Sequence, residues 1–107
     1  MSPSDYRGQK LDRQEARKQV SKIISKNPNE VRFSVHATQE LMKDGLTTVD
    51  AQNVLKSSDA KIHQDGEFEK GSYRYRMETT NLVVVIAFTV DGSGLNVVTA
   101  WDKRKGG

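Results

Sequence analysis

The sequence predicts an α+β domain whose N-terminal helices pack on one face of a three- or four-stranded antiparallel sheet. Helical patterns come first and strand patterns follow, an order that argues against alternating βαβ units. The strongest strand is Leu82–Val90, whose β-branched and aromatic side chains lack polar alternation, so we expect burial on both faces. Short turns connect it to Ser72–Met77 and to Leu95–Trp101, which predicts an antiparallel meander centred on Leu82–Val90.

The chain has 107 residues, enough for one domain with a small core. We expect residues 1–10 to form a loose leader, residues 11–103 to form the domain, and residues 104–107 to be a disordered tail. The chain has no cysteine, which excludes disulfides and thiolate metal sites and fits a cytoplasmic protein. It also has no apolar run typical of a signal peptide or a membrane span, so we expect no membrane partner.

Three helices are predicted, each from a start signal. The first covers Asp12–Lys26, where apolar residues recur at helical spacing behind an aspartate cap and a proline two residues further on ends the helix. The second begins after Ser34 and ends at Gly45, a typical C-terminal glycine. Thr47 and Asp50 have the spacing of a capping box, which opens the third helix.

The remaining segments carry weaker patterns. Val31–Val35 alternates apolar and polar residues and predicts a short strand. Ala60–Gln64 is a weak strand candidate, and Asp65-Gly66 predicts a turn. We interpret Glu67–Gly71 as a polar connector.

The charge balance is only mildly basic, with 17 lysines and arginines against 14 acidic residues and a formal net charge of +3. The basic residues gather in the first helix, in the Ser72–Met77 strand and at the C-terminus. Those of interest are Arg17, Lys18, Lys22, Arg74, Arg76 and Lys103. Such clusters fit a polyanionic partner, and they fit an ordinary solvated surface equally well.

The Ser72–Met77 strand separates its side chains by chemistry. Because side chains alternate across a strand, Tyr73 and Tyr75 point to one face and Arg74 and Arg76 to the other. The arginines lie about 6.6 Å apart along the strand, so they can hold one phosphate or contact two in succession. The competing interpretation pairs them with nearby glutamates on a solvated face, and the tyrosines are either core or active-site residues.

His36 lies in the first turn of the second predicted helix, where backbone N–H groups and the helix dipole attract anions. An imidazole there can exchange protons near neutral pH, although histidines near a helix start more often have a structural role. On the last strand, Thr99, Trp101 and Lys103 share one parity and so can contact a ribose, a base and a phosphate. The alternative places Trp101 in the core. The two histidines lack metal-site spacing, so we expect no metal or other cofactor.

Several of these segments together resemble a known family. They are Ser34-Val35-His36-Ala37, Asp44-Gly45-Leu46-Thr47-Thr48, Val54-Leu55, Tyr73-Arg74-Tyr75-Arg76 and the valine-rich strand. The chain is similar over Val31–Trp101 to small bacterial toxin-like domains grouped with the RelE-, BrnT- and MqsR-like ribonucleases. The resemblance implies a RelE/barnase-like ribonuclease fold, with metal-independent RNA cleavage on the exposed face of the sheet.

The resemblance also implies site residues and partners. It carries over His36 from the His-Ala motif, and Arg74 and Arg76 from the Arg-x-Arg strand, as the catalytic residues. RNA contacts are expected from Lys103, Thr99, Arg17, Lys18 and Lys22. RNA, either mRNA or tRNA, is the expected substrate, and a cognate antitoxin is the expected protein partner. The alternative is a non-catalytic binding module of the same fold, either a gyrase-type inhibitor or a nucleic-acid-binding regulator.

Overall fold

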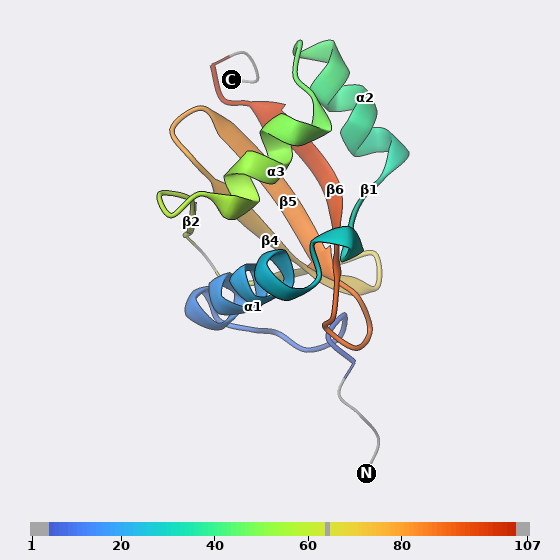
Figure 1. Ribbon diagram of the computed structural model, residues 1–107. Coiled ribbons are helices and arrows are strands. Elements are labelled where there is room, and N and C mark those ends of the chain that lie inside the picture. Colours follow the sequence, from blue (N-terminus) through green and yellow to red (C-terminus); the bar gives the residue numbers. More distant parts are fainter. Residues whose placement is uncertain (1–4, 64, 105–107) are drawn as a thin grey trace.

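A computed structural model gives the structure of the chain and describes residues 5–63 and 65–104 (Figure 1). The expectations for residues 1–4, Gln64 and residues 105–107 lie outside the described residues. The helices are α1 (Arg13–Lys26), the 3₁₀ turn η1 (Pro28–Glu30), α2 (Val35–Lys43) and α3 (Thr48–Lys56). The strands are β1 (Val31–Phe33), β2 (Lys61–Ile62), β3 (Glu67–Glu69), β4 (Ser72–Glu78), β5 (Leu82–Phe88) and β6 (Leu95–Asp102). The predicted α+β class is confirmed.

The sheet has the strand order β1-β6-β5-β4-β2, and β3 pairs with β4 outside this path. The antiparallel meander β4-β5-β6 is confirmed. The prediction of three or four antiparallel strands was wrong, because the sheet has six strands within the described residues and β1 pairs with β6 in parallel. The short strand predicted within Val31–Val35 and the weak candidate within Ala60–Gln64 form β1 and β2, so β3 is the strand of this sheet that was not predicted.

The interpretation of Glu67–Gly71 as a connector was also wrong, because this segment forms β3 and a tight hairpin turn into β4. Glu69 pairs with Ser72, so only two residues, Lys70 and Gly71, make the turn. Both have positive φ, 50° and 88°, as the commonest two-residue hairpin turns require. The turn type therefore positions β3, although the composition of the segment is not that of a typical strand.

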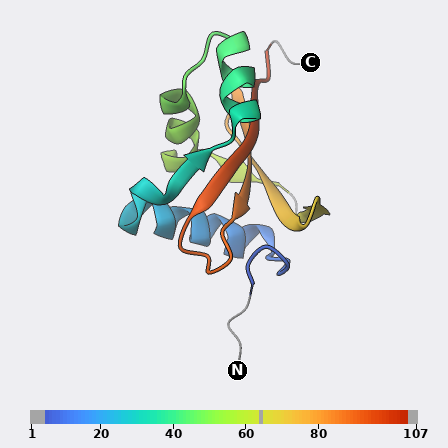
Figure 2. The ribbon, with the colours of Figure 1, turned by 90° about the vertical axis from the view of Figure 1, so that its right-hand side faces the viewer.

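Helices α1 and α3 cover one face of the sheet, and the other face carries no helix within the described chain (Figures 1 and 2). The core lies under these helices. It includes Ala16, Val20 and Ile23 of α1, Ala51, Val54 and Leu55 of α3, and Tyr75, Met77, Val84, Ile86, Phe88 and Val97 of the sheet. None of the described helices is both long and apolar enough to cross a membrane. The β3–β4 hairpin, yellow in Figure 2, extends to the side away from α1 and α3.

Helix α2 lies along β6 and is bonded to it at both ends. The Ser34 hydroxyl accepts a hydrogen bond from the Ala37 N–H at 3.0 Å, the predicted cap, and donates to the Val98 carbonyl at 2.8 Å. At the other end the Asp102 N–H donates to the Asp44 carboxylate at 3.0 Å. The first turn of α2 is therefore held beside the middle of β6.

A β-bulge lies at this point of attachment. Val85 pairs with Thr99 and Ile86 with Val97, so Val98 is an extra residue in β6. The expected alternation put Val98 on the same face as Ala100. Instead Val98 joins Thr99 at the uncovered face, whereas Ala100 is in the core. Bulges commonly redirect side chains in this way.

The N-terminal segment that was expected to be a loose leader lies, over residues 5–10, against the sheet. The Tyr6 N–H donates to the Val90 carbonyl at 2.9 Å, and the Tyr73 N–H donates to the Arg7 carbonyl at 2.7 Å. The buried Tyr75 hydroxyl accepts from the Leu11 N–H at 2.9 Å. Burial raises the pKa of Tyr75, so this hydroxyl stays protonated and Tyr75 is a core residue.

Candidate active site

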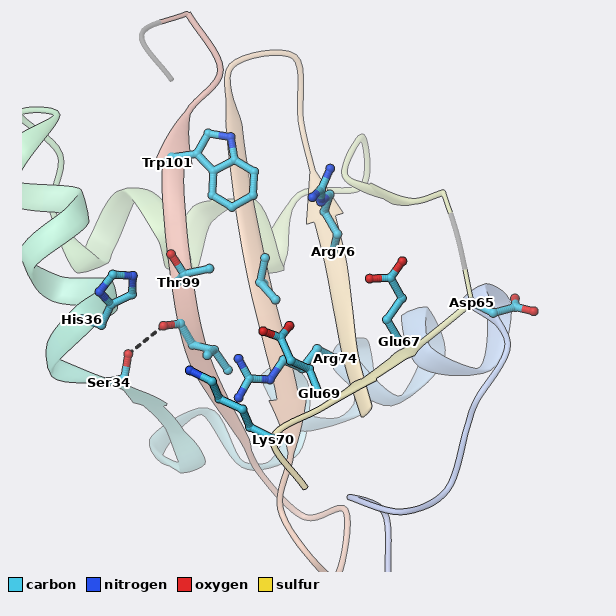
Figure 3. A pocket seen from close by; sticks show the side chains of 12 residues that line it. Ser34, His36, Asp65, Glu67, Glu69, Lys70, Arg74, Arg76, Thr99 and Trp101 are labelled. Atoms are coloured by element: carbon cyan, nitrogen blue, oxygen red, sulfur yellow. Dashed lines mark hydrogen bonds between the residues drawn. The ribbon is translucent and has the colours of Figure 1, made fainter. Parts of the chain in front are cut away.

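The uncovered face of the sheet contains a cavity of about 650 Å³. It brings together three separate parts of the chain, namely the start of α2, the β3–β4 hairpin, and the middle of β4, β5 and β6 (Figure 3). Its lining residues are Ser34, His36, Asp65, Glu67, Glu69, Lys70, Arg74, Arg76, Val85, Val98, Thr99 and Trp101. The volume is typical of a site for a small molecule or a short segment of a polymer.

His36 reaches this cavity from the first turn of α2, next to Thr99 (Figure 3). The Ser34 bonds to Ala37 and to the bulge fix that turn, so the local backbone determines where the imidazole lies. His36 is exposed, and its ring makes no hydrogen bond or ion pair to any described residue. The imidazole is therefore available to a ligand.

Arg74 enters the cavity from β4. Its side chain is half-buried beside β3, in register with Glu67. The buried Nε atom has no hydrogen-bond partner among the described residues. Arg74 also takes part in none of the ion pairs found within the described residues, 5–63 and 65–104. A buried donor without an acceptor costs free energy, and an anionic ligand in the cavity would relieve this cost.

Arg76 and Trp101 form the third part of the site. The Arg76 guanidinium carbon lies 5.2 Å from the centroid of the Trp101 ring, within the range of a cation–π contact. Trp101 is half-buried, lines the cavity and lies outside the core cluster, so the alternative of a core tryptophan was wrong. Arg76 pairs with Val85, which pairs with Thr99, so these three side chains cross the floor of the cavity in one row.

The β3–β4 hairpin adds residues that the sequence argument did not select. Glu67, Glu69 and Lys70 line the cavity, and Asp65 lies at its margin (Figure 3). The site therefore contains carboxylates as well as cations. Gly71 was the available signal, because glycine suits the second position of a two-residue hairpin turn.

The other predicted RNA contacts lie elsewhere. The Lys103 ammonium pairs with the Glu78 carboxylate at 2.9 Å and is outside the cavity, because β6 ends at Asp102 and the strand parity ends with it. Arg17 donates to the carbonyls of Ser57 and Ala60, so it joins α1 to the segment after α3. Lys18 and Lys22 are exposed side chains of α1 and do not line the cavity.

Two general observations bear on the chemistry. Within residues 5–63 and 65–104, no three histidine or acidic side chains are placed to hold a metal ion. The cavity does combine an imidazole, carboxylates and guanidiniums. Such a set can move protons and stabilise negative charge on a bound group.

Searches with family models, among curated proteins and among solved structures each gave no match for this chain. The arrangement of the cavity and the resemblance of the motifs that line it are therefore what bears on function.

Proposed function

We propose that the protein is a toxin-type endoribonuclease that cleaves RNA in the cavity on the uncovered face of the sheet. The observation that carries the proposal is the meeting of His36, from α2, with Arg74 and Arg76, from β4, in one cavity. The unpartnered Nε atom of Arg74 adds direct support for an anionic ligand. Arginine binds phosphate as well as carboxylate groups through paired hydrogen bonds, and phosphate is the anion that RNA supplies.

The proposed reaction is attack of a ribose 2′-hydroxyl on the adjacent phosphorus. A base takes the 2′-hydroxyl proton, the P–O bond to the next nucleotide breaks, and an acid protonates the leaving 5′-oxygen. The products are a 2′,3′-cyclic phosphate and a free 5′-hydroxyl. His36 serves as one proton-transfer group, and Arg74 and Arg76 stabilise the charge that develops on the phosphate oxygens.

The second proton-transfer group is assigned to the hairpin. Glu67 and Glu69 are the carboxylates that β3 contributes to the cavity, on the side away from α2. A carboxylate and an imidazole on opposite sides of a phosphate can act as base and acid for the attacking and leaving oxygens. Because both residues come from β3, the two-residue turn that pairs β3 with β4 becomes part of the catalytic arrangement.

The same proposal includes the fold family and the partners. An α+β domain with one uncovered sheet face is what the resemblance to RelE/barnase-like ribonucleases implies. We therefore include a cognate antitoxin and a cytoplasmic location in the proposal. An antitoxin that covers the face carrying His36 and Arg74 would block the cavity.

The test is incubation of single-stranded RNA with the purified protein in EDTA. We expect cleavage that leaves cyclic phosphate ends, and a rate at least tenfold lower for His36→Ala and for Arg74→Ala. Lys22→Ala, a change of an exposed α1 lysine, is the matched control and should retain the wild-type rate. Undiminished cleavage by both site variants would refute the assignment. Binding without cleavage by the wild type would favour the non-catalytic module.

A further inference from the structure

The Arg76–Trp101 pair is a feature of the cavity that phosphate binding does not explain. On the open face of the sheet, the Arg76 guanidinium carbon lies over the Trp101 ring, 5.2 Å from its centroid. The pair is at the end of the cavity away from the hairpin. Trp101 pairs in register with Val83, which is only 2% exposed, so the indole also lies beside the apolar floor. The half-buried indole therefore has one part against the protein and one part open to the cavity, as tryptophans at binding interfaces commonly do.

We propose that this pair is a stacking site for one unpaired nucleobase. Aromatic rings and guanidinium planes both stack on bases, and they do so without selecting a particular base. The inference rests on the proposed function only in placing a nucleic acid in the cavity. The bound nucleic acid is then a single strand in which one base unstacks from its neighbours and stacks on Trp101.

The spacing along β4 supports this placement. Arg74 and Arg76 project from the same face of the strand, about 6.6 Å apart. A phosphate held at the unpartnered Arg74 Nε thus places the neighbouring base near Arg76 and Trp101, one nucleotide away. Thr99, in the same row as Arg76, lies between this position and His36, where the ribose belongs.

The size of the cavity argues against a duplex. A volume of about 650 Å³ accommodates one or two nucleotides. In a duplex, each paired base also has both of its faces covered by the neighbouring bases. A base must be unpaired and unstacked before it can lie on Trp101. We therefore expect single strands and loops to bind and duplexes of the same sequence to bind weakly.

Trp101 is the only tryptophan of the chain, so its fluorescence reports on this position alone. The experiment titrates the full-length protein with a DNA oligonucleotide, which lacks the 2′-hydroxyl and is not cut, and with an abasic strand of equal length and charge. We expect the base-bearing strand to quench Trp101 and to bind more tightly than the abasic strand. Equal affinity and equal quenching by the two strands would overturn the proposal.

Variants separate stacking from a structural role of the indole. By fluorescence anisotropy of labelled strands, Trp101→Ala should weaken binding of the base-bearing strand by about five- to 150-fold, the range for loss of one base–aromatic stack. Binding of the abasic strand should be unchanged, and Trp101→Phe should retain most of the preference. Arg74→Ala should weaken both strands. If both Trp101 variants lost binding of the base-bearing strand and of the abasic strand alike, the role of the indole would be structural and the proposal would be overturned.

The outcomes also distinguish this inference from the nuclease itself. Base-dependent quenching without RNA cleavage would retain the stacking site and refute the endoribonuclease. Cleavage that depends on His36, with no preference for the base-bearing strand, would retain the endoribonuclease and refute the stacking site.

Discussion

At the scale of single residues, β4 presents Arg74 and Arg76 to the cavity on one face and buries Tyr75 in the core on the other. The alternation of side chains along a strand predicts this separation. Sequence could not decide the position of Trp101, because an indole suits both a core and a binding face. It also missed Glu69, because an isolated glutamate in a polar stretch looks like an ordinary surface residue.

Arg74 offers a test of whether the site is built at the expense of stability. We expect Arg74→Met to raise the free energy of unfolding by about 1 kcal/mol, because it removes a buried donor without an acceptor and keeps an unbranched side chain. RNA cleavage should fall at least tenfold in the same variant. Chemical denaturation and a cleavage assay measure the two effects.

Arg76→Met is the matched control, because Arg76 is exposed and already contacts Trp101. It should not gain stability. If Arg74→Met lowered the free energy of unfolding more than Arg76→Met does, this would contradict the view that the Arg74 side chain lacks a partner until an anion binds.

At the scale of elements, the helix starts and ends were predictable because they depend on local hydrogen bonds. The capping box of Thr47 and Asp50 is present, and Gly45 has a φ of 75° after the end of α2. The bulge at Val98 was not predictable, since it depends on how β6 pairs with β5. The strand β3 was missed for the same reason, because its pairing with β4 outweighs its weak intrinsic preference.

The Ser34 hydroxyl connects two of these elements, and its loss should affect the site as well as the fold. We expect Ser34→Ala to lower the free energy of unfolding by about 1–2 kcal/mol, because it removes the helix cap and the bond to Val98. It should also slow RNA cleavage, because the first turn of α2 positions His36. Denaturation curves and cleavage rates under fully folded conditions test both effects.

Thr47→Ala removes a comparable cap at the start of α3, away from the cavity. It should lower stability by a similar amount and leave the cleavage rate unchanged. Equal cleavage rates in the two cap variants would show that the Ser34 bonds do not position His36.

At the scale of the whole molecule, the central result is that the basic residues are divided between two faces. The meander and the covering helices were predictable from the order of patterns. The division of the basic residues was not predictable, because it depends on which face of the sheet α1 packs against. Burial of Ala16 and Val20 directs the lysines of α1 away from the sheet, whereas Arg74 and Arg76 lie on the opposite side. A single strand in the cavity is therefore not expected to reach α1.

The most direct test of this account is to map backbone amide shifts in the NMR spectrum while adding a short single-stranded DNA oligonucleotide. The account predicts that the shifts concentrate at the start of α2, the β3–β4 hairpin and the part of β6 near Thr99 and Trp101. Shifts concentrated along α1 around Lys18 and Lys22, with the cavity unaffected, would contradict it.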